Sequence, residues 1–319
     1  MSRQVYISRR LPARAMEEFS RICEYDVNPE NRQATREELI NAVKNYEVVV
    51  SMLNDQIDAE LISQAGPGLK LIANYGVGFN NIDVKAANAR GIYISNTPDV
   101  LTDATADLAW ALLFSAARRV IEGDNICRTS RFLWEPEYML GYDISGKTLG
   151  IIGAGRIGSN FARKAALGFG MRVIYYGRHN SPELDKIGGK LVTLDELLRE
   201  ADYVSLHVPL TPDTRHMLGA EEFPKMKPTA ILVNTARGPV IDESALADAL
   251  KNHVIAAAGL DVYENEPDIN PELKKLANVV LMPHVGSATF DTRTNMGLMV
   301  ARNAEAVLAG KTPPNLVRV

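Results

Sequence analysis

Short apolar runs alternate with helical runs along the first hundred residues of the chain. The apolar runs predict strands, and glycine or proline follows several of them, as expected where a strand ends. This alternation is typical of parallel strands with helices on both faces of the sheet. The predicted strands are 5–8, 47–53, 69–75 and 92–95, and the predicted helices are 13–21, 36–44, 59–64 and 84–89.

The same alternation returns in the second half of the chain. The predicted strands there are 149–152, 171–176, 203–208, 230–234, 255–260 and 279–282, and the predicted helices are 159–167, 194–199, 243–252 and about 289–309. With 319 residues, two domains are the first expectation. We therefore predict an α/β protein with two doubly wound parallel-sheet domains.

A long run rich in Ala and Leu separates the two regions. It covers residues 103–127, contains Trp110, and would be capped by Thr102 or Asp103. We predict one long helix here, which connects the two α/β halves. The arm that follows, 130–142, is aromatic and contains a proline. Its apolar side chains need a cover, and a partner subunit is one candidate.

Composition narrows the classes of partner. Hydrophobic residues make up 46% of the chain, enough for full cores, and the net charge of −4 does not suggest a nucleic-acid or membrane surface. No apolar run approaches the roughly 18 residues of a membrane span, and the N-terminus has no signal-peptide cleavage pattern. Cys23 and Cys127 belong to no metal or redox motif, so we expect reduced thiols in a cytoplasmic protein.

A G-x-G-x-x-G turn lies between the predicted strand 149–152 and the predicted helix 159–167. Gly153 would permit the tight turn, Gly155 would let the backbone approach a pyrophosphate, and Gly158 would let the helix pack on the strand. The helix N-terminus would offer free N–H groups to that phosphate. This arrangement predicts dinucleotide binding; the alternative is a tight turn in a protein that binds something else.

The end of the next predicted strand indicates which dinucleotide is bound. In NAD-binding folds an acidic residue about 20 residues beyond the glycines accepts the ribose hydroxyls. Here that position is Gly177, and Arg178 follows it. An arginine can bind the additional 2′-phosphate of NADP, and one such contact contributes about 1.5–3 kcal/mol. We therefore predict that NADP(H) is preferred over NAD(H); the alternative is a solvated arginine with no cofactor role.

Three later strands are followed by Arg237, Glu266 and His284. Ligands bind beyond the carboxyl ends of strands in a doubly wound sheet, so these side chains could converge on the reactive ring of the cofactor. The set suits carbonyl reduction. His284 is the natural general acid because the pKa of an unperturbed imidazole lies near neutrality. Glu266 would orient the imidazole and favour its protonated form, and Arg237 would bind a substrate carboxylate and polarise the carbonyl.

Each of these residues also has an ordinary structural interpretation. A single histidine at a strand end is often structural, an arginine there can form a surface ion pair, and a glutamate before Pro267 can be a turn residue. His207 lies at another strand end and is the competing candidate for the acid. The remaining histidines are in loop or helix-end positions and are expected to be solvated: His179, His216 and His253.

A second glycine-rich stretch, 74–79, follows a strand of the first half. Its backbone N–H groups could form another anion cradle that faces the cofactor. The alternative is a plain turn between a strand and a helix.

Taken together, these motifs resemble the D-isomer-specific 2-hydroxyacid dehydrogenase family. The similarity extends over essentially the whole chain, and within the family it is greatest to the glyoxylate/hydroxypyruvate reductases. The stretches that carry it are 74–83, 103–110, 140–147, Gly153-Ala-Gly-Arg-Ile-Gly158, Asn234-Thr-Ala-Arg-Gly238, Gly259-Leu-Asp-Val-Tyr-Glu-Asn-Glu-Pro267 and Pro283-His-Val-Gly-Ser-Ala288.

The resemblance implies a role for each matching position. Arg237 would bind the substrate carboxylate, Glu266 would pair with the histidine, and His284 would donate the proton. Leu53, Val77 and Gly78 would contact the substrate together with Arg237 and His284, and no metal is implied. The cofactor-binding residues implied are Thr105, Gly153, Ala154, Gly155, Arg156, Ile157, Gly158, Gly177, Arg178, His179, Val208, Pro209, Thr235, Ala236, Arg237, Asp261, His284 and Gly286.

The resemblance also implies an organisation and an activity. A flavodoxin-like substrate domain, residues 1–100 and 288–319, would contain an inserted NADP-binding Rossmann domain, residues 101–287. The protein would form homodimers through the 120–145 arm. It would use NADPH to reduce glyoxylate and hydroxypyruvate, small 2-oxo acids, to the D-2-hydroxy acid. The alternatives are a bulkier 2-oxo acid as substrate, or a dinucleotide-sensing scaffold similar to the corepressors that share this fold.

Overall fold

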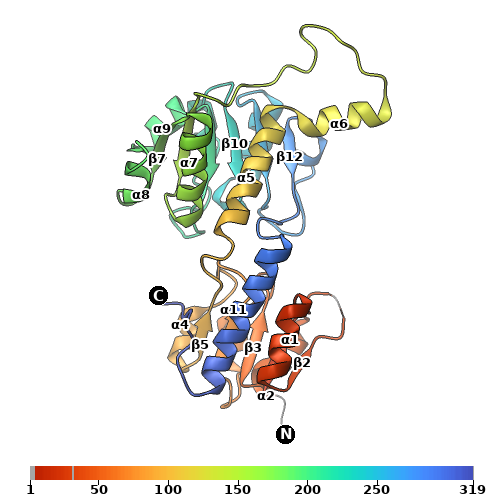
Figure 1. The fold of residues 1–319 in the computed structure, drawn as a ribbon, viewed down its shortest axis with the longest axis vertical. Coiled ribbons are helices and arrows are strands. Elements are labelled where there is room, and N and C mark those ends of the chain that lie inside the picture. The colour runs from red at the N-terminus through yellow and green to blue at the C-terminus, as the bar shows by residue number, and fades with distance from the viewer. Residues whose placement is uncertain (1–3, 31, 319) are drawn as a thin grey trace. The chain divides into compact units, whose positions relative to one another are not determined.

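The computed structural model describes residues 4–30 and 32–318. Two compact units make up the chain, and each is described by itself. Unit 1 consists of two chain segments, Met1–Leu101 and Ser287–Val319, and unit 2 is the segment between them, Thr102–Gly286. The two units are drawn in Figure 1.

Unit 1 is built on a parallel sheet of five strands in the order β2-β1-β3-β4-β5. This is the flavodoxin-like order, and the direction of winding reverses between β1 and β3. Its elements are β1 (Val5–Ile7), α1 (Ala13–Ile22), β2 (Tyr25–Val27), α2 (Arg36–Asn45), β3 (Val48–Ser51), α3 (Ala59–Ser63), β4 (Leu71–Asn74), α4 (Val84–Ala89), β5 (Tyr93–Ser95) and α11 (Phe290–Leu308).

The core of unit 1 explains why these segments form strands and helices. β3 and β4 are buried along their whole length, as expected for parallel strands that are covered on both faces. α1 packs against α11, and the apolar sides of α2, α3 and α4 meet in one hydrophobic cluster. The sharp beginning of α2 comes from a capping box between Thr35 and Glu38.

Unit 2 is built on a parallel sheet of seven strands in the order β12-β11-β10-β9-β6-β7-β8. The order from β8 to β6 and then from β9 outward is that of a Rossmann fold. Its elements are α5 (Thr102–Ala117), α6 (Val120–Thr129), β6 (Thr148–Ile152), α7 (Arg156–Phe169), β7 (Arg172–Tyr176), α8 (Pro182–Asp185), β8 (Lys190–Leu191), α9 (Leu194–Glu200), β9 (Tyr203–Leu206), η1 (Phe223–Lys225), β10 (Ile231–Asn234), η2 (Gly238–Val240), α10 (Glu243–Lys251), β11 (Ala257–Leu260), η3 (Leu273–Lys275) and β12 (Val279–Leu281).

Two hydrophobic clusters cover the two faces of this sheet. One lies under α5 and α7 and includes a stack of Trp110 on Phe161, with ring centroids 4.5 Å apart. The other lies under α9 and α10. The predicted class, two doubly wound parallel sheets, is therefore confirmed.

The prediction of one long helix over 103–127 is wrong. The structure has two helices there, α5 and α6, and Arg119 between them has a φ of 53°. That left-handed conformation cannot continue a right-handed helix, so the chain turns at this residue. α6 buries none of its side chains, and the loop after it extends away from the rest of unit 2 (Figure 1).

Within residues 4–30 and 32–318, no helix is long and apolar enough to cross a bilayer.

Candidate active site

The candidate residues of unit 2 lie in consecutive positions along one edge of its sheet. All seven strands are parallel, so their carboxyl ends share this edge, and the winding reverses between β9 and β6. A crevice for a ligand forms at such a switch point. From β12 to β7, the segments after the strand ends carry His284, Glu266, Arg237, His207, the turn Gly153–Gly158, and Gly177 to His179.

The three glycines of the turn after β6 have different reasons for being glycine. Gly153 has a φ of 101°, and a Cβ on Gly158 would lie 2.2 Å from the carbonyl oxygen of Gly153. The protein's own geometry therefore requires glycine at both positions. A Cβ on Gly155 would meet no atom of the described residues within 4 Å. The turn leaves open space at Gly155, directly before α7.

The first turn of α7 faces the same space. Gly155 is its N-cap and supplies no side-chain acceptor. Ala154, Arg156 and Ile157 surround this cap in the sequence, so the orphan N–H groups of the helix start are displayed there. Such an end attracts anions.

The strand on each side of β6 contributes further candidates. Gly177, Arg178 and His179 follow β7, and the side chains of Arg178 and His179 are exposed. Within the described residues, Arg178 has no hydrogen bond or ion pair. Val208, after β9, lies against the glycine turn, since its Cγ1 would be 2.8 Å from a Cβ on Gly153.

After β9, at the same edge, Pro209 is exposed. Near the middle of the edge, after β10, the N–H of Ala236 donates to the side chain of Asn234, 2.9 Å away. The neighbouring hydroxyl of Thr235 is buried and has no hydrogen-bond partner among the described residues. An orphaned buried hydroxyl is uncommon in a folded protein and indicates a site for a polar partner.

The predicted pair of His284 and Glu266 lies in contact. Nδ1 of His284 is 2.7 Å from one carboxylate oxygen of Glu266, and the other oxygen accepts the N–H of Tyr263 at 2.9 Å. Burial raises the pKa of Glu266. The hydrogen bond and the charge of His284 together lower it by more, so this pKa lies below its ordinary value. Glu266 therefore holds the ring at Nδ1 and leaves Nε2 available for a ligand.

Asp261 braces the turn that presents His284. Its two oxygens accept the N–H groups of Val285 and Gly286, at 2.7 and 2.8 Å. His284 itself has a φ of 54°, a strained conformation for a side chain of this size. A Cβ on Gly286 would lie 3.2 Å from Asp261 and 3.3 Å from Thr105, so these three predicted residues are neighbours. Sequence reasoning had not foreseen this bracing role of Asp261.

Arg237 is held beside the pair. Its Nη1 donates to the carbonyl of Ala236 at 2.6 Å. Burial lowers the pKa of Arg237, and the charge of Glu266 opposes that effect. Arg237 is partly buried, and a guanidinium in such a place binds a carboxylate more strongly than a fully exposed one. The structure thus brings Arg237, Glu266 and His284 together at the ends of three neighbouring strands.

The other histidines differ from His284. The ring of His207 bonds the hydroxyl of Ser205 at 2.9 Å, and burial lowers the pKa of His207 to about 3. His179 and His253 are exposed, as expected. His216 is exposed as well, but it is not merely solvated, because its Nε2 lies 2.5 Å from a carboxylate oxygen of Glu264.

In unit 1 the predicted substrate residues gather at the carboxyl ends of β3 and β4. Leu53 packs so closely on Gly76 that a Cβ there would lie 2.4 Å from it. The side chains of Asn96 and Asn74 hold the carbonyls of Val77 and Gly78, at 2.8 and 2.7 Å. This fixes the 74–79 stretch as a rigid turn.

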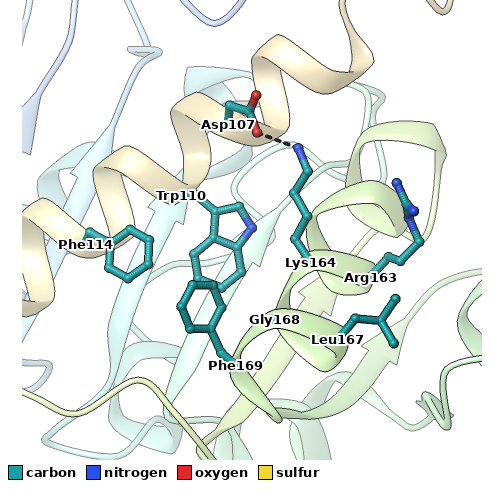
Figure 2. A pocket seen from close by; sticks show the side chains of 8 residues that line it. All are labelled: Asp107, Trp110, Phe114, Arg163, Lys164, Leu167, Gly168 and Phe169. Atoms are coloured by element: carbon teal, nitrogen blue, oxygen red, sulfur yellow. Dashed lines mark hydrogen bonds and ion pairs between the residues drawn. The ribbon is translucent and has the colours of Figure 1, made fainter.

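An open hollow of about 510 Å³ lies elsewhere in unit 2 (Figure 2). Trp110, Phe114 and Phe169 line it, and an ion pair between Asp107 and Lys164 crosses it. It lies by the last turn of α7, at the opposite end of that helix from the glycine turn, so it is separate from the candidate site. Within residues 4–30 and 32–318, no group of three or more His, Cys, Asp or Glu residues could hold a metal ion.

Comparison with known proteins gives relatives over the full length of the chain. Glyoxylate reductase of Thermococcus kodakarensis is 50% identical, and the alignment covers 99% of this chain and 96% of the relative. A crystal structure of a glyoxylate reductase from Paecilomyes thermophila has a TM-score of 0.89 at 36% identity, with 99% and 98% of the two chains covered.

A third relative was solved with ligands. It is the NADPH-dependent glyoxylate/hydroxypyruvate reductase of Sinorhizobium meliloti in complex with NADP and malonate, with a TM-score of 0.86 at 30% identity and coverage of 99% and 97%. The family model for the NAD-binding domain of D-isomer-specific 2-hydroxyacid dehydrogenases matches residues 110–286, the segment that carries the glycine turn and the pair of Glu266 and His284. Sequence, fold and the order of residues along the sheet edge agree, and the chain belongs to the D-isomer-specific 2-hydroxyacid dehydrogenase family.

Proposed function

We propose that this protein reduces small 2-oxo acids, glyoxylate and hydroxypyruvate, to 2-hydroxy acids with NADPH, and forms the D isomer where the product is chiral. The observation that carries the proposal is the contact of His284 with Glu266 beside Arg237, on the same sheet edge as the glycine turn. Relatives named glyoxylate reductase support the choice of substrate.

The residues of the sheet edge fit a dinucleotide. The open space at Gly155 and the uncapped start of α7 suit a pyrophosphate. Further along the edge, the buried hydroxyl of Thr235 would gain a polar partner, and Thr105, Asp261 and Gly286 would border the nicotinamide half. Bound NADPH would supply the hydride.

The protein's own residues would handle the carboxylate and the proton. Arg237 would bind the carboxylate of the 2-oxo acid through its planar fork and polarise the carbonyl. When hydride reaches the carbonyl carbon, negative charge develops on oxygen, and His284 would donate a proton to it from Nε2. Glu266 would stabilise the imidazolium through Nδ1 until that transfer occurs. Asp261 would keep the turn of His284 in place.

We assign the remaining substrate contacts to Leu53, Val77 and Gly78 of unit 1. Asparagine side chains hold the carbonyls of Val77 and Gly78 in place. The backbone N–H groups of these two residues would then bind the anion. The size of Leu53 would limit the substrate. In Leu53→Ala, we expect kcat/KM for branched 2-oxo acids to rise relative to glyoxylate; an unchanged ratio would argue against this role.

The decisive experiment is NADPH oxidation by the purified protein across a panel of 2-oxo acids, with NADH beside NADPH. Turnover of glyoxylate and hydroxypyruvate above the bulkier acids supports the proposal. Preference for an aryl or branched acid would move the assignment to that substrate. Cofactor binding without turnover of any acid would instead favour a dinucleotide-sensing scaffold.

The preference for NADPH is part of the proposal. Arg178 is exposed at the end of β7 with no partner among the described residues, and Gly177 supplies no carboxylate to repel a 2′-phosphate. In Arg178→Ala, we expect the ratio of kcat/KM for NADPH over NADH to fall about tenfold to a hundredfold. Arg199→Ala, another exposed arginine of unit 2, should leave the ratio unchanged. A wild-type ratio below one would refute the assignment.

We also propose that the protein is a homodimer joined through the 120–145 arm. α6 buries no side chain, and Trp134 in the following loop is 89% exposed, with Phe132 and Leu133 beside it. A run of exposed apolar residues of this kind is typical of an interface. Light scattering should give a dimer mass for the wild type and a smaller mass for Trp134→Ser with Phe132→Ser; a monomeric wild type would contradict this part.

A further inference from the structure

The position of Glu266 depends on the turn that contains it. One of its oxygens accepts the N–H of Tyr263 within the same turn, and the other contacts His284. The side chain therefore has little freedom of its own. Whatever fixes the turn Tyr263–Glu266 also fixes the carboxylate on which His284 rests.

A second glutamate holds this turn from outside. The N–H of Glu264, in the middle of the turn, donates to the carboxylate of Glu243 at the start of α10. In return, the N–H of Glu243 points to the carboxylate of Glu264 at 3.5 Å. The two residues thus exchange backbone-to-carboxylate bonds, a reciprocal arrangement between segments that are far apart in the chain.

Glu243 occupies an unusual place for a carboxylate. Glu243 is only 5% exposed. Burial raises the pKa of Glu243 above its ordinary value, although the hydrogen bond from the N–H of Glu264 opposes this shift. Burying a carboxylate is costly unless hydrogen bonds replace the lost water. Backbone N–H groups of Glu264 and Asn270 donate to this carboxylate and replace part of the lost water.

The same contact links the segments of Arg237 and Glu266. Gly238, next to Arg237, lies against the backbone of Tyr263, where a Cβ would be 1.9 Å from the carbonyl carbon. η2 then leads directly into α10 and Glu243. The chain that carries Arg237 therefore touches the turn of Glu266 at two points, Gly238 and Glu243.

His216 adds a third segment. Its Nε2 lies 2.5 Å from Glu264, and it comes from the loop that follows β9, the strand with Val208 and Pro209 at its end. One carboxylate, that of Glu264, is thus shared by the start of α10 and by this loop.

We propose that Glu243 and Glu264 are positioning residues for the reaction. By their reciprocal bonds they hold the turn of Glu266 against the segment of Arg237, so that the proton donor and the carboxylate-binding group stay in register. The inference rests on the proposed reductase function and adds to it two residues outside the set to which that function assigns substrate or cofactor contacts. Small displacements matter here, because a misplacement of about 1 Å can cost roughly a hundredfold in rate.

Three variants of Glu243 test the proposal. Glu243→Gln keeps an oxygen that can accept the N–H of Glu264, so kcat with glyoxylate should stay near the wild-type value. Glu243→Asp keeps the charge but cannot reach that N–H, and Glu243→Leu removes the acceptor. For both we expect kcat to fall about tenfold to a hundredfold, while KM for NADPH stays unchanged.

The readouts separate positioning from folding. The stoichiometry of NADPH binding counts correctly folded molecules, and kcat is expressed per bound NADPH. Glu221→Leu, which replaces an exposed glutamate of the same unit, is the matched control and should leave kcat unchanged. If Glu243→Leu does not fold, Glu243→Asp against Glu243→Gln gives the same comparison.

Each outcome decides something different. Loss of kcat in Glu243→Asp with recovery in Glu243→Gln supports the proposal. A kcat per bound NADPH close to the wild type in Glu243→Asp and Glu243→Leu overturns it and leaves Glu243 as a packing residue only. If the wild type itself reduces no 2-oxo acid, the proposed function fails, and that result does not depend on Glu243.

Discussion

His207 and His284 follow two strands of the same sheet, β9 and β12, and both rings lie at its carboxyl edge. Their surroundings are opposite. His207 has a hydroxyl partner, Ser205, and burial lowers its pKa to about 3, so it is neutral at physiological pH. His284 has a carboxylate partner, Glu266, whose oxygen lies 2.7 Å from Nδ1 of the ring. The partner, rather than the place at a strand end, decides which histidine can act as an acid.

The backbone shows the same contrast. His284 has a φ of 54° and needs Asp261 to hold the two N–H groups that follow it. The backbone of His207 instead packs directly against the glycine turn, since a Cβ on Gly153 would lie 2.7 Å from the carbonyl of His207. His253 has a similar φ of 53°, so the brace from Asp261, rather than the φ value, distinguishes the backbone of His284.

The largest effect is expected from His284→Ala. Removal of the proton donor should lower kcat with glyoxylate by about a hundredfold to ten-thousandfold, since general acid catalysis contributes that much. Steady-state kinetics at saturating NADPH measure it, and His253→Ala, an exposed histidine at the end of α10, is the control. Turnover that survives in His284→Ala would refute the acid role of His284 and make His207 the candidate proton donor.

Arg237→Lys should have the next largest effect. Lysine keeps the charge but loses the planar fork that binds a carboxylate with two bonds. We expect KM for glyoxylate to rise about tenfold to a hundredfold, in line with the loss of a charge-assisted bond, and kcat to change less. A variant with unchanged KM and reduced kcat would show that Arg237 acts on the carbonyl rather than on the carboxylate.

Glu266→Gln tests the partner of His284 directly. The amide oxygen can still accept from Nδ1, but the negative charge is gone, so we expect a loss of about tenfold in kcat/KM. Because the pKa of Glu266 is lowered on folding, the carboxylate stabilises the wild type above its unfolded pKa of about 4.3, and this is lost as the pH falls through the folded value.

The melting temperature measures how the stabilisation by Glu266 depends on pH. The difference in Tm between the wild type and Glu266→Gln should shrink in acid, as the wild-type carboxylate becomes protonated. A difference that stays constant across the acid range would mean that Glu266 is not stabilised by its charge in the folded state.

Much of this architecture could be predicted from the sequence because it rests on local patterns. Buried parallel strands are short apolar runs, and Gly153 and Gly158 in the turn after β6 are required by backbone geometry alone. Strand ends that carry Arg237, Glu266 and His284 were predictable for the same reason. A parallel sheet places all such ends along one edge, whatever the side chains do there.

The remainder depends on contacts that leave no local pattern. The break at Arg119 lies inside a sequence that favours helix throughout, and a single left-handed residue creates it. Glu243 resembles any acidic residue at a helix start, where a negative charge is favourable anyway. Its bond to Glu264 and the contact of His216 with the same carboxylate appear only when three segments meet in space.

The smallest effect on rate is expected from His207→Gln, and it is the sharpest test of the comparison. Glutamine can still bond Ser205, so kcat with glyoxylate should stay within a few-fold of the wild type. Stability should respond instead. Folded His207 resists protonation down to about pH 3, whereas the unfolded side chain takes up a proton below about pH 6.5.

The unfolded state therefore binds more protons across that interval, and the free energy of unfolding of the wild type falls as the pH is lowered through it. Above the interval His207 adds no pH dependence. Glutamine cannot titrate, so urea unfolding at a series of pH values should show a shallower loss of stability in acid for His207→Gln. An equal loss in both proteins would show that the ring of His207 takes up a proton while folded, and the contrast with His284 would then rest on Glu266 alone.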